Sequence, residues 1–423
     1  MNKKLLAVAV AGALAAPGVA LAQSSVTISG FLKMSVEQYT IGNANAARTI
    51  AGQGTNNSQT LLADDSSRLI FNMTEDLGGG LRAIGQIDFR VTMDAGAVAA
   101  NGNNHVGLRS SQWGTVFFGR QDLHYGGRES DLTAKNDLRA DSISLLAYAG
   151  GGGSPIAAAT RTPNVVVYRT PDWQGFYVLG AYSFNPATAN GFEQDIGSPL
   201  RKGRAWNLNP VWEARNFTIG YSYWTQKADA GNAAASAVSL AAAQASVNFV
   251  TPPGSAAPAA NTADQRGDRL FGSYRWGGFK IGLAWDKSKL KGGGSGTELS
   301  RRDAWSVPIE YTWGPHWIGG HYTRANDDKA TTCANALPGT LTVNGGSCAA
   351  GEDKDGAKMW AIGYNYSMSK RTSVGVTYAQ IKNDAGAFYT PFTANSGLAG
   401  SAAHAALRGE DPHFWSVTIR HSF

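Results

Sequence analysis

The sequence predicts an all-β fold, a transmembrane antiparallel β-barrel of sixteen strands. The prediction rests on composition, on a two-residue alternation of apolar side chains and on alternating short and long connections. Only 16% of the 423 residues are charged, 52 are glycine and 10% are aromatic, whereas an average soluble domain has about 25% charged residues and about 7% glycine. This composition argues against a disordered chain, a coiled coil or a helical enzyme. The mean hydropathy of −0.23 excludes a bundle of membrane-spanning helices, each of which needs about 20 apolar residues.

The first segment has the pattern of a secretory signal peptide. Two lysines precede an apolar run at residues 5–16, a Pro-Gly pair ends that run, and an A-x-A site lies at 20–22. This order is typical of an export signal, and the Pro-Gly pair disfavours the alternative of a membrane anchor. We expect residues 1–22 to be cleaved and residues 23–423 to form a single barrel domain. The formal net charge of +6, without a run of like charges, predicts no nucleic-acid partner.

Apolar and polar side chains alternate along the start of the mature chain. Residues 26–37 place Val, Ile, Leu and Met on one phase and Lys, Ser and Glu on the other, with Phe31 as an exception. Residues 68–74 and 81–91 repeat the pattern. Such alternation gives each strand one apolar and one polar face.

Short and long connections follow one another in strict order. Seven short turns rich in Gly, Pro, Asn and Ser lie at 76–80, 111–114, 172–175, 214–216, 277–278, 314–315 and 367–370. Eight long polar stretches lie at about 40–66, 92–104, 122–162, 184–203, 225–267, 288–302, 325–357 and 382–411. Together they join sixteen strands, with the short periplasmic turns and long external loops of an outer-membrane barrel. Residues 228–268 are long enough for another hairpin, so eighteen strands is the alternative.

Ten aromatic residues lie near predicted strand ends: Trp212, Trp224, Trp276, Trp285, Trp313, Trp317, Tyr322, Tyr364, Tyr366 and Tyr378. Rings at strand ends are typical of the girdles at both membrane interfaces, whereas a soluble sheet core is the alternative. A barrel of sixteen strands is too wide for its own side chains to fill and leaves an aqueous channel. The sequence therefore predicts transport rather than catalysis.

Three motifs carry a resemblance to a known family. The string TEDLGGGLRA at 74–83 resembles the second hairpin of trimeric general porins of the Gram-negative outer membrane, of the β-proteobacterial type. Residues 118–121, Phe-Gly-Arg-Gln, resemble the end of the family's fifth strand, and residues 419–423 are similar to its closing signature. Ser422 departs from the Lys or Arg that the family most often has there. The resemblance covers the whole mature chain.

The resemblance implies a homotrimer in the cell outer membrane, in contact with outer-membrane lipid and without a cofactor. Each barrel would pass ions and small hydrophilic solutes by passive diffusion. The third long loop, about residues 122–162, would fold inward and narrow the pore. The barrel-assembly machinery would read the last strand through Trp415, Val417, Ile419 and Phe423.

Basic side chains are expected on one wall of the constriction. Lys33, Arg68 and Arg82 fall on the polar phase of their strands and are expected to face the lumen. By resemblance, the basic cluster of the wall comprises Lys33, Arg68, Arg120 and Arg161. Arg120 shares the parity of apolar neighbours, so we expect a bulge at Gly119 to turn it inward. For Arg82 and Arg90 a lumen position away from the narrowest point is an equal alternative.

Acidic side chains of the third loop are expected to oppose this wall. The acidic candidates are Glu129, Asp131, Asp137 and Asp141, and His124 is a further constriction candidate of this loop. His124 stands where family members often carry an acid, and Arg128 follows it closely. Charged rings set ion selectivity in pores, so these departures predict a weak anion preference. A solute-selective channel for phosphate or carboxylates, lined by Arg68, Arg82, Arg90, Arg120 and Arg161, is the alternative.

Other functions have weaker support in the sequence. Cys333 and Cys348 share one long connection, so in an exported protein we expect a disulfide, worth about 3 kcal/mol on the chain-entropy model; two free thiols are the alternative. Ligand spacing for a metal site is lacking. No G-x-S-x-G, H-E-x-x-H or nucleotide motif occurs, so we expect no enzyme, although a barrel hydrolase can assemble its triad across strands. The alternative of a structural or adhesion barrel is supported by the long loops alone.

Overall fold

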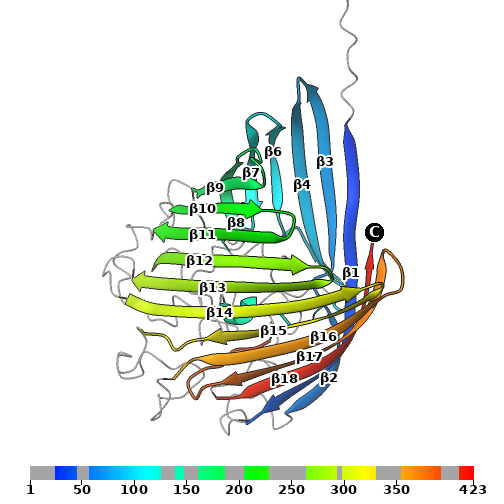
Figure 1. Cartoon of the computed structure of the whole chain (residues 1–423), viewed down its shortest axis with the longest axis vertical. Coiled ribbons are helices and arrows are strands. Elements are labelled where there is room, and N and C mark those ends of the chain that lie inside the picture. Colours follow the sequence, from blue (N-terminus) through cyan, green and yellow to red (C-terminus); the bar gives the residue numbers. More distant parts are fainter. Residues whose placement is uncertain are drawn as a thin grey trace, which may run out of the picture.

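A computed structural model describes most of the mature chain. The described residues are 24–44, 57–124, 138, 140–146, 161–184, 186, 204–227, 263–292, 298–329, 354–391 and 409–423. Almost all of their regular structure is strand, and Figure 1 shows the strands following one another around a barrel wall. The predicted signal peptide lies outside the described residues.

The strands and the one short helix follow in chain order. They are β1 (Ser25–Gly42), β2 (Ser58–Asp64), β3 (Arg68–Gly78), β4 (Leu81–Thr92), β5 (Ala97–Ala99), β6 (Asn104–Ser110), β7 (Gly114–Gln121), α4 (Ile143–Leu146), β8 (Thr162–Arg169), β9 (Phe176–Ser183), β10 (Arg204–Glu213), β11 (Phe217–Lys227), β12 (Ala263–Trp276), β13 (Phe279–Gly292), β14 (Glu298–Trp313), β15 (His316–Ala325), β16 (Ala357–Ser367), β17 (Thr372–Asn383) and β18 (Asp411–Ser422). Every pairing between neighbouring strands is antiparallel, and β1 pairs with β18 to close the barrel.

The eighteen described strands occupy sixteen positions in the wall, which confirms the prediction. β2 and β3 both pair with β1, one after the other, and form a single wall position interrupted at residues 65–67. β5 and β6 share β4 in the same way. The two additional strands therefore come from interruptions, and not from a hairpin at 228–268, where residues 263–268 belong to β12.

The seven short turns are confirmed, and three of the long connections are corrected. β13 continues to Gly292 and β14 begins at Glu298, inside the predicted connection 288–302. β1 continues to Gly42 and β2 begins at Ser58, inside the predicted connection 40–66, and β5 lies inside 92–104. Both added strands are short and lack clear alternation. They pair with the extended ends of β1 and β4. Their formation is therefore favoured by backbone hydrogen bonds to these longer strands, and a local sequence pattern does not reveal such pairing.

Side chains alternate strictly between the two faces of the wall, as β16 illustrates. Lys358, Trp360 and Ile362 are exposed on the outer face, whereas Met359 and Ala361 are buried on the inner face. Two predicted girdle residues are corrected: Trp224 and Trp317 are buried on the inner face. The period of two determines on which face of the wall a side chain lies, whereas its distance from the strand end does not. Among the described helical residues, no helix is both long and apolar enough to span a membrane.

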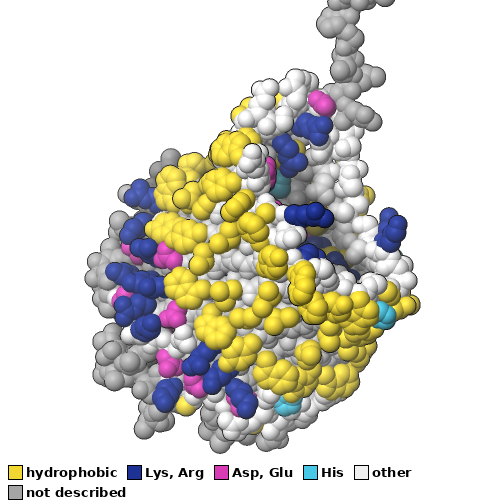
Figure 2. Space-filling view, in the orientation of Figure 1, with side chains coloured by type: hydrophobic (Ala, Val, Ile, Leu, Met, Phe, Trp, Pro, Cys, Tyr) yellow, Lys and Arg dark blue, Asp and Glu magenta, His cyan; other side chains and the backbone are white. Residues whose placement is uncertain are grey.

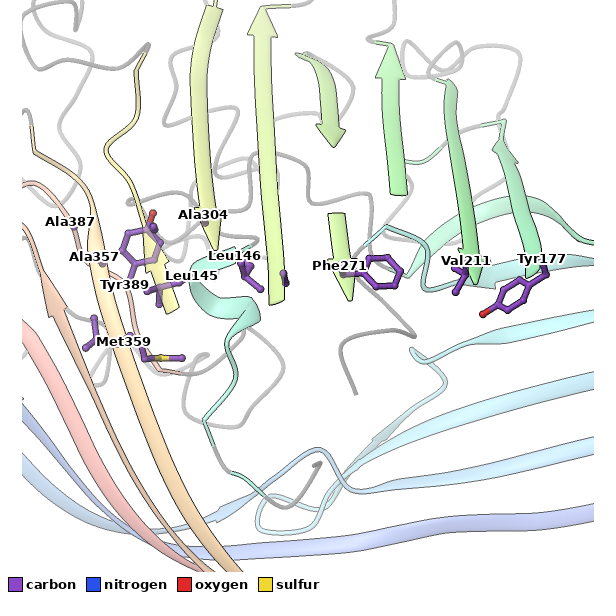
Figure 3. Close-up of a cluster of buried hydrophobic side chains, with 13 residues drawn as sticks. Leu145, Leu146, Tyr177, Val211, Phe271, Ala304, Ala357, Met359, Ala387 and Tyr389 are labelled. Atoms are coloured by element: carbon purple, nitrogen blue, oxygen red, sulfur yellow. The ribbon is translucent and has the colours of Figure 1, made fainter. Parts of the chain in front are cut away.

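The described part of the third long loop lies inside the barrel. Its helix α4 contacts β14, β15 and β16, and Leu145 and Leu146 are completely buried in a cluster with Met359 and Tyr389 (Figure 3). Since Met359 points to the lumen, the loop is packed on the inner wall. The predicted inward fold of this loop is confirmed for the described residues.

Candidate pore constriction

The interruption between β2 and β3 positions the first basic side chain. Lys33 of β1 is buried and forms an ion pair with Asp65, which lies in the gap. The backbone N–H of Lys33 donates to Ser67 Oγ at 2.9 Å, and Ser67 N–H donates to Asp64 Oδ2 at 3.1 Å. The gap therefore supplies a carboxylate that neutralises Lys33.

Phe31, the exception to the alternation of β1, lies on the inner face between two arginines. The guanidinium carbon of Arg68 is 4.9 Å from its ring centroid and that of Arg420 is 4.5 Å away. These distances fit cation–π contacts. The aromatic ring thus holds two cations at the wall without neutralising their charge.

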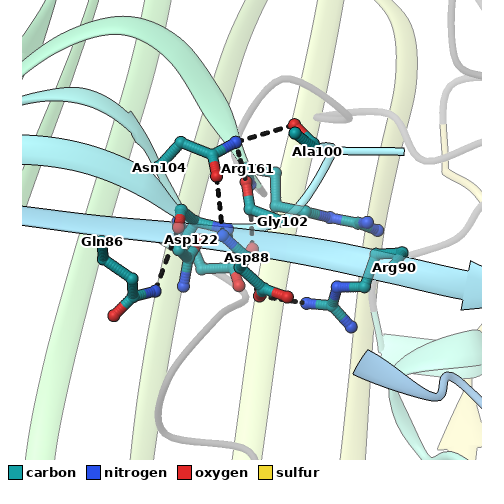
Figure 4. A network of polar contacts seen from close by, with 9 residues as sticks. Gln86, Asp88, Arg90, Ala100, Gly102, Asn104, Asp122 and Arg161 are labelled. Atoms are coloured by element: carbon teal, nitrogen blue, oxygen red, sulfur yellow. Dashed lines mark hydrogen bonds and ion pairs between the residues drawn. The ribbon is translucent and has the colours of Figure 1, made fainter. Parts of the chain in front are cut away.

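Arg90 and Asp88 lie two residues apart on the inner face of β4, and Figure 4 shows their surroundings. Arg90 Nη2 is 3.1 Å from Asp88 Oδ2. Asn104 Oδ1 accepts the backbone N–H of Asp88 at 2.8 Å. Arg161 joins this group through its backbone N–H, which donates to Asp122 Oδ1 at 3.0 Å. Residues from β4, from the start of β6 and from both ends of the third loop therefore meet here.

Arg120 reaches the inner wall through the bulge expected from the sequence. The register of β7 with β8 shifts between Gly119 and Gln121. Gly119 has φ +148°, and a side chain at this position would collide with the carbonyl oxygen of Asn104. A bulge reverses the facing of the next residue, so glycine here allows Arg120 to depart from the parity of β7.

The cations of this wall outnumber its acids. Electrostatic contacts connect Arg90, Arg120 and Arg161, which share Asp122 as an acidic neighbour. Arg68 contacts the same group. The enclosed Nε atoms of Arg68, Arg90 and Arg120 find no hydrogen-bond acceptor in the part of the chain that the structure describes. Four guanidinium groups therefore share two carboxylates, those of Asp88 and Asp122. We call these six residues the basic wall.

Arg82 lies apart from the basic wall. It pairs in register with Asp76 beside the short turn between β3 and β4, and its side chain is 58% exposed. The distance from its Nε to Asp76 Oδ2 is 4.0 Å. Its strand phase directs it to the lumen, but its height places it at the end of the barrel.

His124 docks the third loop on the wall instead of forming its tip. Its Nδ1 lies 2.9 Å from Ser222 Oγ of β11, and its Nε2 lies 3.5 Å from Asp286 Oδ2 of β13. Burial lowers the pKa of His124, and the neighbouring Asp286 opposes that shift. The predicted candidate for the pore-facing loop is thus enclosed between loop and wall.

Asp141 is partly exposed and caps the short helix. Its Oδ1 accepts the backbone N–H of Ile143 at 2.9 Å, and its own N–H donates to the carbonyl oxygen of Pro391 at 3.3 Å. Burial raises the pKa of Asp141 to about 6, although the bond from Ile143 opposes this shift. The other acidic candidates, Glu129, Asp131 and Asp137, lie outside the described residues, as do Cys333 and Cys348.

The docking of the third loop is expected to weaken as the pH rises through about 6. The docked state holds a proton on Asp141 at pH values where a free carboxyl, with a pKa of 3.8, has lost it. Docking is therefore most favourable below about pH 4. Above pH 6 the free energy of docking is less favourable by about 3 kcal/mol than below pH 4, since each pKa unit corresponds to about 1.4 kcal/mol. Hydrogen exchange of residues 140–146, corrected for intrinsic rates, should increase from pH 5 to pH 7.

Asp141→Asn is the matched control for this pH dependence. Asparagine keeps an acceptor for Ile143 N–H but does not ionise, so exchange in the variant should no longer vary across this range. An equal pH dependence in the variant would assign it to another group.

The sequence reasoning missed a buried anchor of the same loop. Arg302 of β14 is 1% exposed. Its Nη2 donates to the carbonyl oxygen of Leu146 at 2.9 Å, and its Nη1 donates to Tyr389 Oη at 2.5 Å. The strand phase places Arg302 on the inner face, but no pattern in the sequence indicates that the loop reaches it.

The residues of the predicted assembly signal occupy the closing edge of the barrel. Trp415, Val417 and Ile419 are exposed on the outer face of β18. Phe423 N–H donates to the carbonyl oxygen of Gly30 at 3.2 Å, and Gly30 N–H donates back at 3.3 Å. The last residue therefore extends the pairing between the first and last strands.

A closed barrel of sixteen wall positions, apolar outside and lined inside by charged side chains and an inserted loop, defines a protein of the outer-membrane channel class. A family model for Gram-negative porins matches residues 7–386, and the chain belongs to this family. Family membership and its relatives place the protein in the outer membrane.

Two curated relatives match about half of the chain. Outer membrane porin protein 32 of Delftia acidovorans is 34% identical over 220 residues, which cover 50% of this chain and 58% of the relative. An outer membrane porin protein of Bordetella pertussis is 27% identical over 234 residues, or 52% and 57% of the two chains. The match thus spans less than two thirds of the length of either relative.

Solved structures share the fold over nearly the whole chain. An anion-selective porin from Comamonas acidovorans has a TM-score of 0.67 at 19% identity and covers 95% of this chain and 100% of its own. The trimer form of OmpT from Vibrio cholerae has a TM-score of 0.57 at 14% identity, with 95% and 99% covered. At these identities the likeness establishes the barrel fold.

Proposed function

We propose that the chain forms a channel for passive diffusion of ions and small hydrophilic solutes, with a weak preference for anions. The observation that carries this proposal is the basic wall, in which four guanidinium groups share two carboxylates. Of the loop residues expected to oppose it, His124 is buried between loop and wall, and Asp141 is bonded to the short helix beside the Lys33–Asp65 pair. The similar Comamonas protein is described as an anion-selective porin, which is consistent with this proposal.

The selectivity follows from electrostatics in an aqueous passage. A surplus of fixed positive charge raises the local concentration of anions and lowers that of cations. The preference stays weak because Lys33 is neutralised by Asp65 and Arg90 lies against Asp88. Mobile ions screen the remaining charge over about 10 Å at 0.1 M salt.

A solute-selective channel is the second candidate, and one observation favours it. The Nε–H groups of Arg68, Arg90 and Arg120 donate to no described acceptor. Guanidinium groups with free donors bind carboxylate and phosphate oxygens in paired geometry. A selective channel would show a conductance that saturates at low concentrations of such an anion, and a general channel would not.

Single-channel recording of purified protein in a planar bilayer tests the proposal. A general channel should give conductance steps, grouped in threes for a homotrimer, and a reversal potential across a salt gradient that shows a mild anion preference. Folded barrels without conductance would refute the channel function. Ester or peptide hydrolysis by the pure protein would then favour the alternative of a barrel hydrolase.

The proposal includes maturation and assembly of the chain. Cleavage after residue 22, a homotrimer, recognition of β18 by the barrel-assembly machinery and a Cys333–Cys348 disulfide complete it. The exposed outer side chains of β18 are consistent with recognition in an extended form. Thiol labelling without reductant distinguishes the disulfide from two free cysteines.

A further inference from the structure

Three basic side chains form a row across the outer face of three adjacent strands. Lys358 of β16 lies directly opposite Arg324 of β15 on one side and Lys382 of β17 on the other. All three are exposed on the outer face. They lie where their strands meet long connections, at the end remote from the short turns. We call these three residues the cationic row.

The cationic row is unusual because like charges face each other. Directly opposite side chains in a sheet have Cβ atoms about 4.5–5.5 Å apart, and equal charges in such pairs destabilise the sheet. None of the three forms an ion pair with a described residue. Other cations on this outer face are matched: Lys227 Nζ is 2.7 Å from Asp264, Arg266 Nε is 3.1 Å from Asp268, and Arg301 Nε is 3.2 Å from Glu298. Lys382 interacts electrostatically with Asp411 but forms no ion pair with it, so the cationic row lacks the close ion-pair partners that its neighbours have.

A band of aromatic rings directly adjoins the cationic row on the membrane side. Tyr322 and Trp360, each two residues from a member of the row, are cross-strand partners. The ring centroids of Trp360 and Tyr378 are 5.0 Å apart, and those of Tyr322 and Trp305 are 5.4 Å apart. Rings of this kind mark the level where hydrocarbon meets headgroups. Figure 2 shows Lys and Arg side chains along the border of the hydrophobic outer belt, at the loop ends of its strands.

We propose that the cationic row binds the phosphate groups of a phosphorylated glycolipid in the outer leaflet. The position of the row along the barrel axis favours a lipid over a free ion. The headgroup phosphate of a lipid lies just beyond the aromatic band, while the acyl chains of the same lipid cover the apolar wall below. A phosphate monoester carries up to two negative charges and three acceptor oxygens, which match several converging cations. Binding also relieves the repulsion within the row. The site lies on the outer face, so it is independent of conduction through the lumen.

Binding of diphosphoryl lipid A to the full-length mature protein in zwitterionic detergent, measured by native mass spectrometry, tests the proposal. The variant R324Q/K358Q/K382Q should bind about tenfold more weakly, which corresponds to about 1.4 kcal/mol. The variant K227Q/R266Q/R301Q removes the same charge from matched cations of the same face and should stay within about twofold of the unsubstituted protein. Dephosphorylated lipid A should bind the unsubstituted protein as weakly as lipid A binds the first variant.

Other outcomes would overturn the assignment. Equal losses in both variants would mean attraction by bulk charge, and unchanged binding in the first variant would exclude the cationic row. Displacement of lipid A by an equimolar amount of inorganic phosphate would assign the row to free anions. A second readout needs no lipid: without repulsion, the first variant should unfold at a higher temperature in detergent. If the triple variant does not fold, K358Q alone should show the same direction in both measurements. Reversal potentials should be unchanged throughout, which separates this test from that of the channel.

Discussion

Replacing both Arg68 and Arg120 by glutamine is expected to shift the ion preference of the channel away from anions and toward cations. The two substitutions remove two of the four guanidinium groups of the basic wall and leave the carboxylates of Asp88 and Asp122 in place. The fixed charge of this wall then falls from a surplus of two cations to balance. The Lys33–Asp65 pair contributes no net charge, so the balanced wall should no longer favour anions.

Coulomb's law gives the scale of this change. In an aqueous passage a unit charge about 5 Å from a passing ion contributes about 0.8 kcal/mol, and screening in about 0.1 M salt reduces this value. Removing two such charges should lower the anion-to-cation permeability ratio several-fold. The reversal potential across a tenfold KCl gradient reports that ratio directly.

Arg82→Gln is the matched control for this experiment. Arg82 lies on the lumen phase of β4, but its side chain is 58% exposed beside the short turn. Salt screens it from ions at the basic wall, so its replacement should leave the reversal potential nearly unchanged. A reversal potential that is unaffected by R68Q/R120Q, or shifted equally by R82Q, would exclude the basic wall as the determinant of selectivity.

The basic wall shows how far strand phase alone predicts a site. The period of two places Lys33, Arg68 and Arg82 on the inner face. In the structure Lys33 is buried and Arg68 lies over the inward-facing ring of Phe31. Phase carries no information on height along the barrel, and this explains why Arg82 lies at the turn while Arg90 joins the cluster. The bulge at Gly119 was predictable because a glycine and an arginine of the wrong parity stand side by side.

The fold was predicted more completely than the third loop. Turn composition and connection length predicted sixteen wall positions. They did not predict β2 and β5, because the pairing of these short strands depends on the lengths of β1 and β4. The roles of His124 and Asp141 depend on which part of the wall the loop reaches. That choice is made by contacts such as His124 with Ser222, which connect residues far apart in sequence and leave no local pattern.

Arg302→Met is expected to release the third loop from the wall and to enlarge the pore. Methionine fills a similar volume but donates no hydrogen bond, so the carbonyl oxygen of Leu146 and the hydroxyl of Tyr389 lose their donor. Each unsatisfied buried group costs about 1–3 kcal/mol. The enclosed carboxyl of Asp355, whose pKa burial raises to about 6, also loses the cation that favours its ionised form.

The consequence for conduction follows from the position of α4. Leu145 and Leu146 are packed against the inner wall only as long as the loop stays docked. A loss of about 3 kcal/mol would reduce the ratio of docked to undocked loops by about two orders of magnitude. Single-channel conductance should therefore increase, with more current noise, and larger hydrophilic solutes should pass faster into liposomes that contain the variant.

Two further variants separate loss of the anchor from loss of charge or of fold. Arg301→Gln changes the neighbouring arginine, which lies on the outer face and pairs with Glu298, and should leave the conductance unchanged. Tyr389→Phe removes one acceptor but keeps the bond from Arg302 to Leu146, so its effect should have the same direction and be smaller. If Arg302→Met folds as a barrel and conducts as the unsubstituted protein does, the inserted loop is held by other contacts, and the docking of His124 on β11 and β13 becomes the principal anchor.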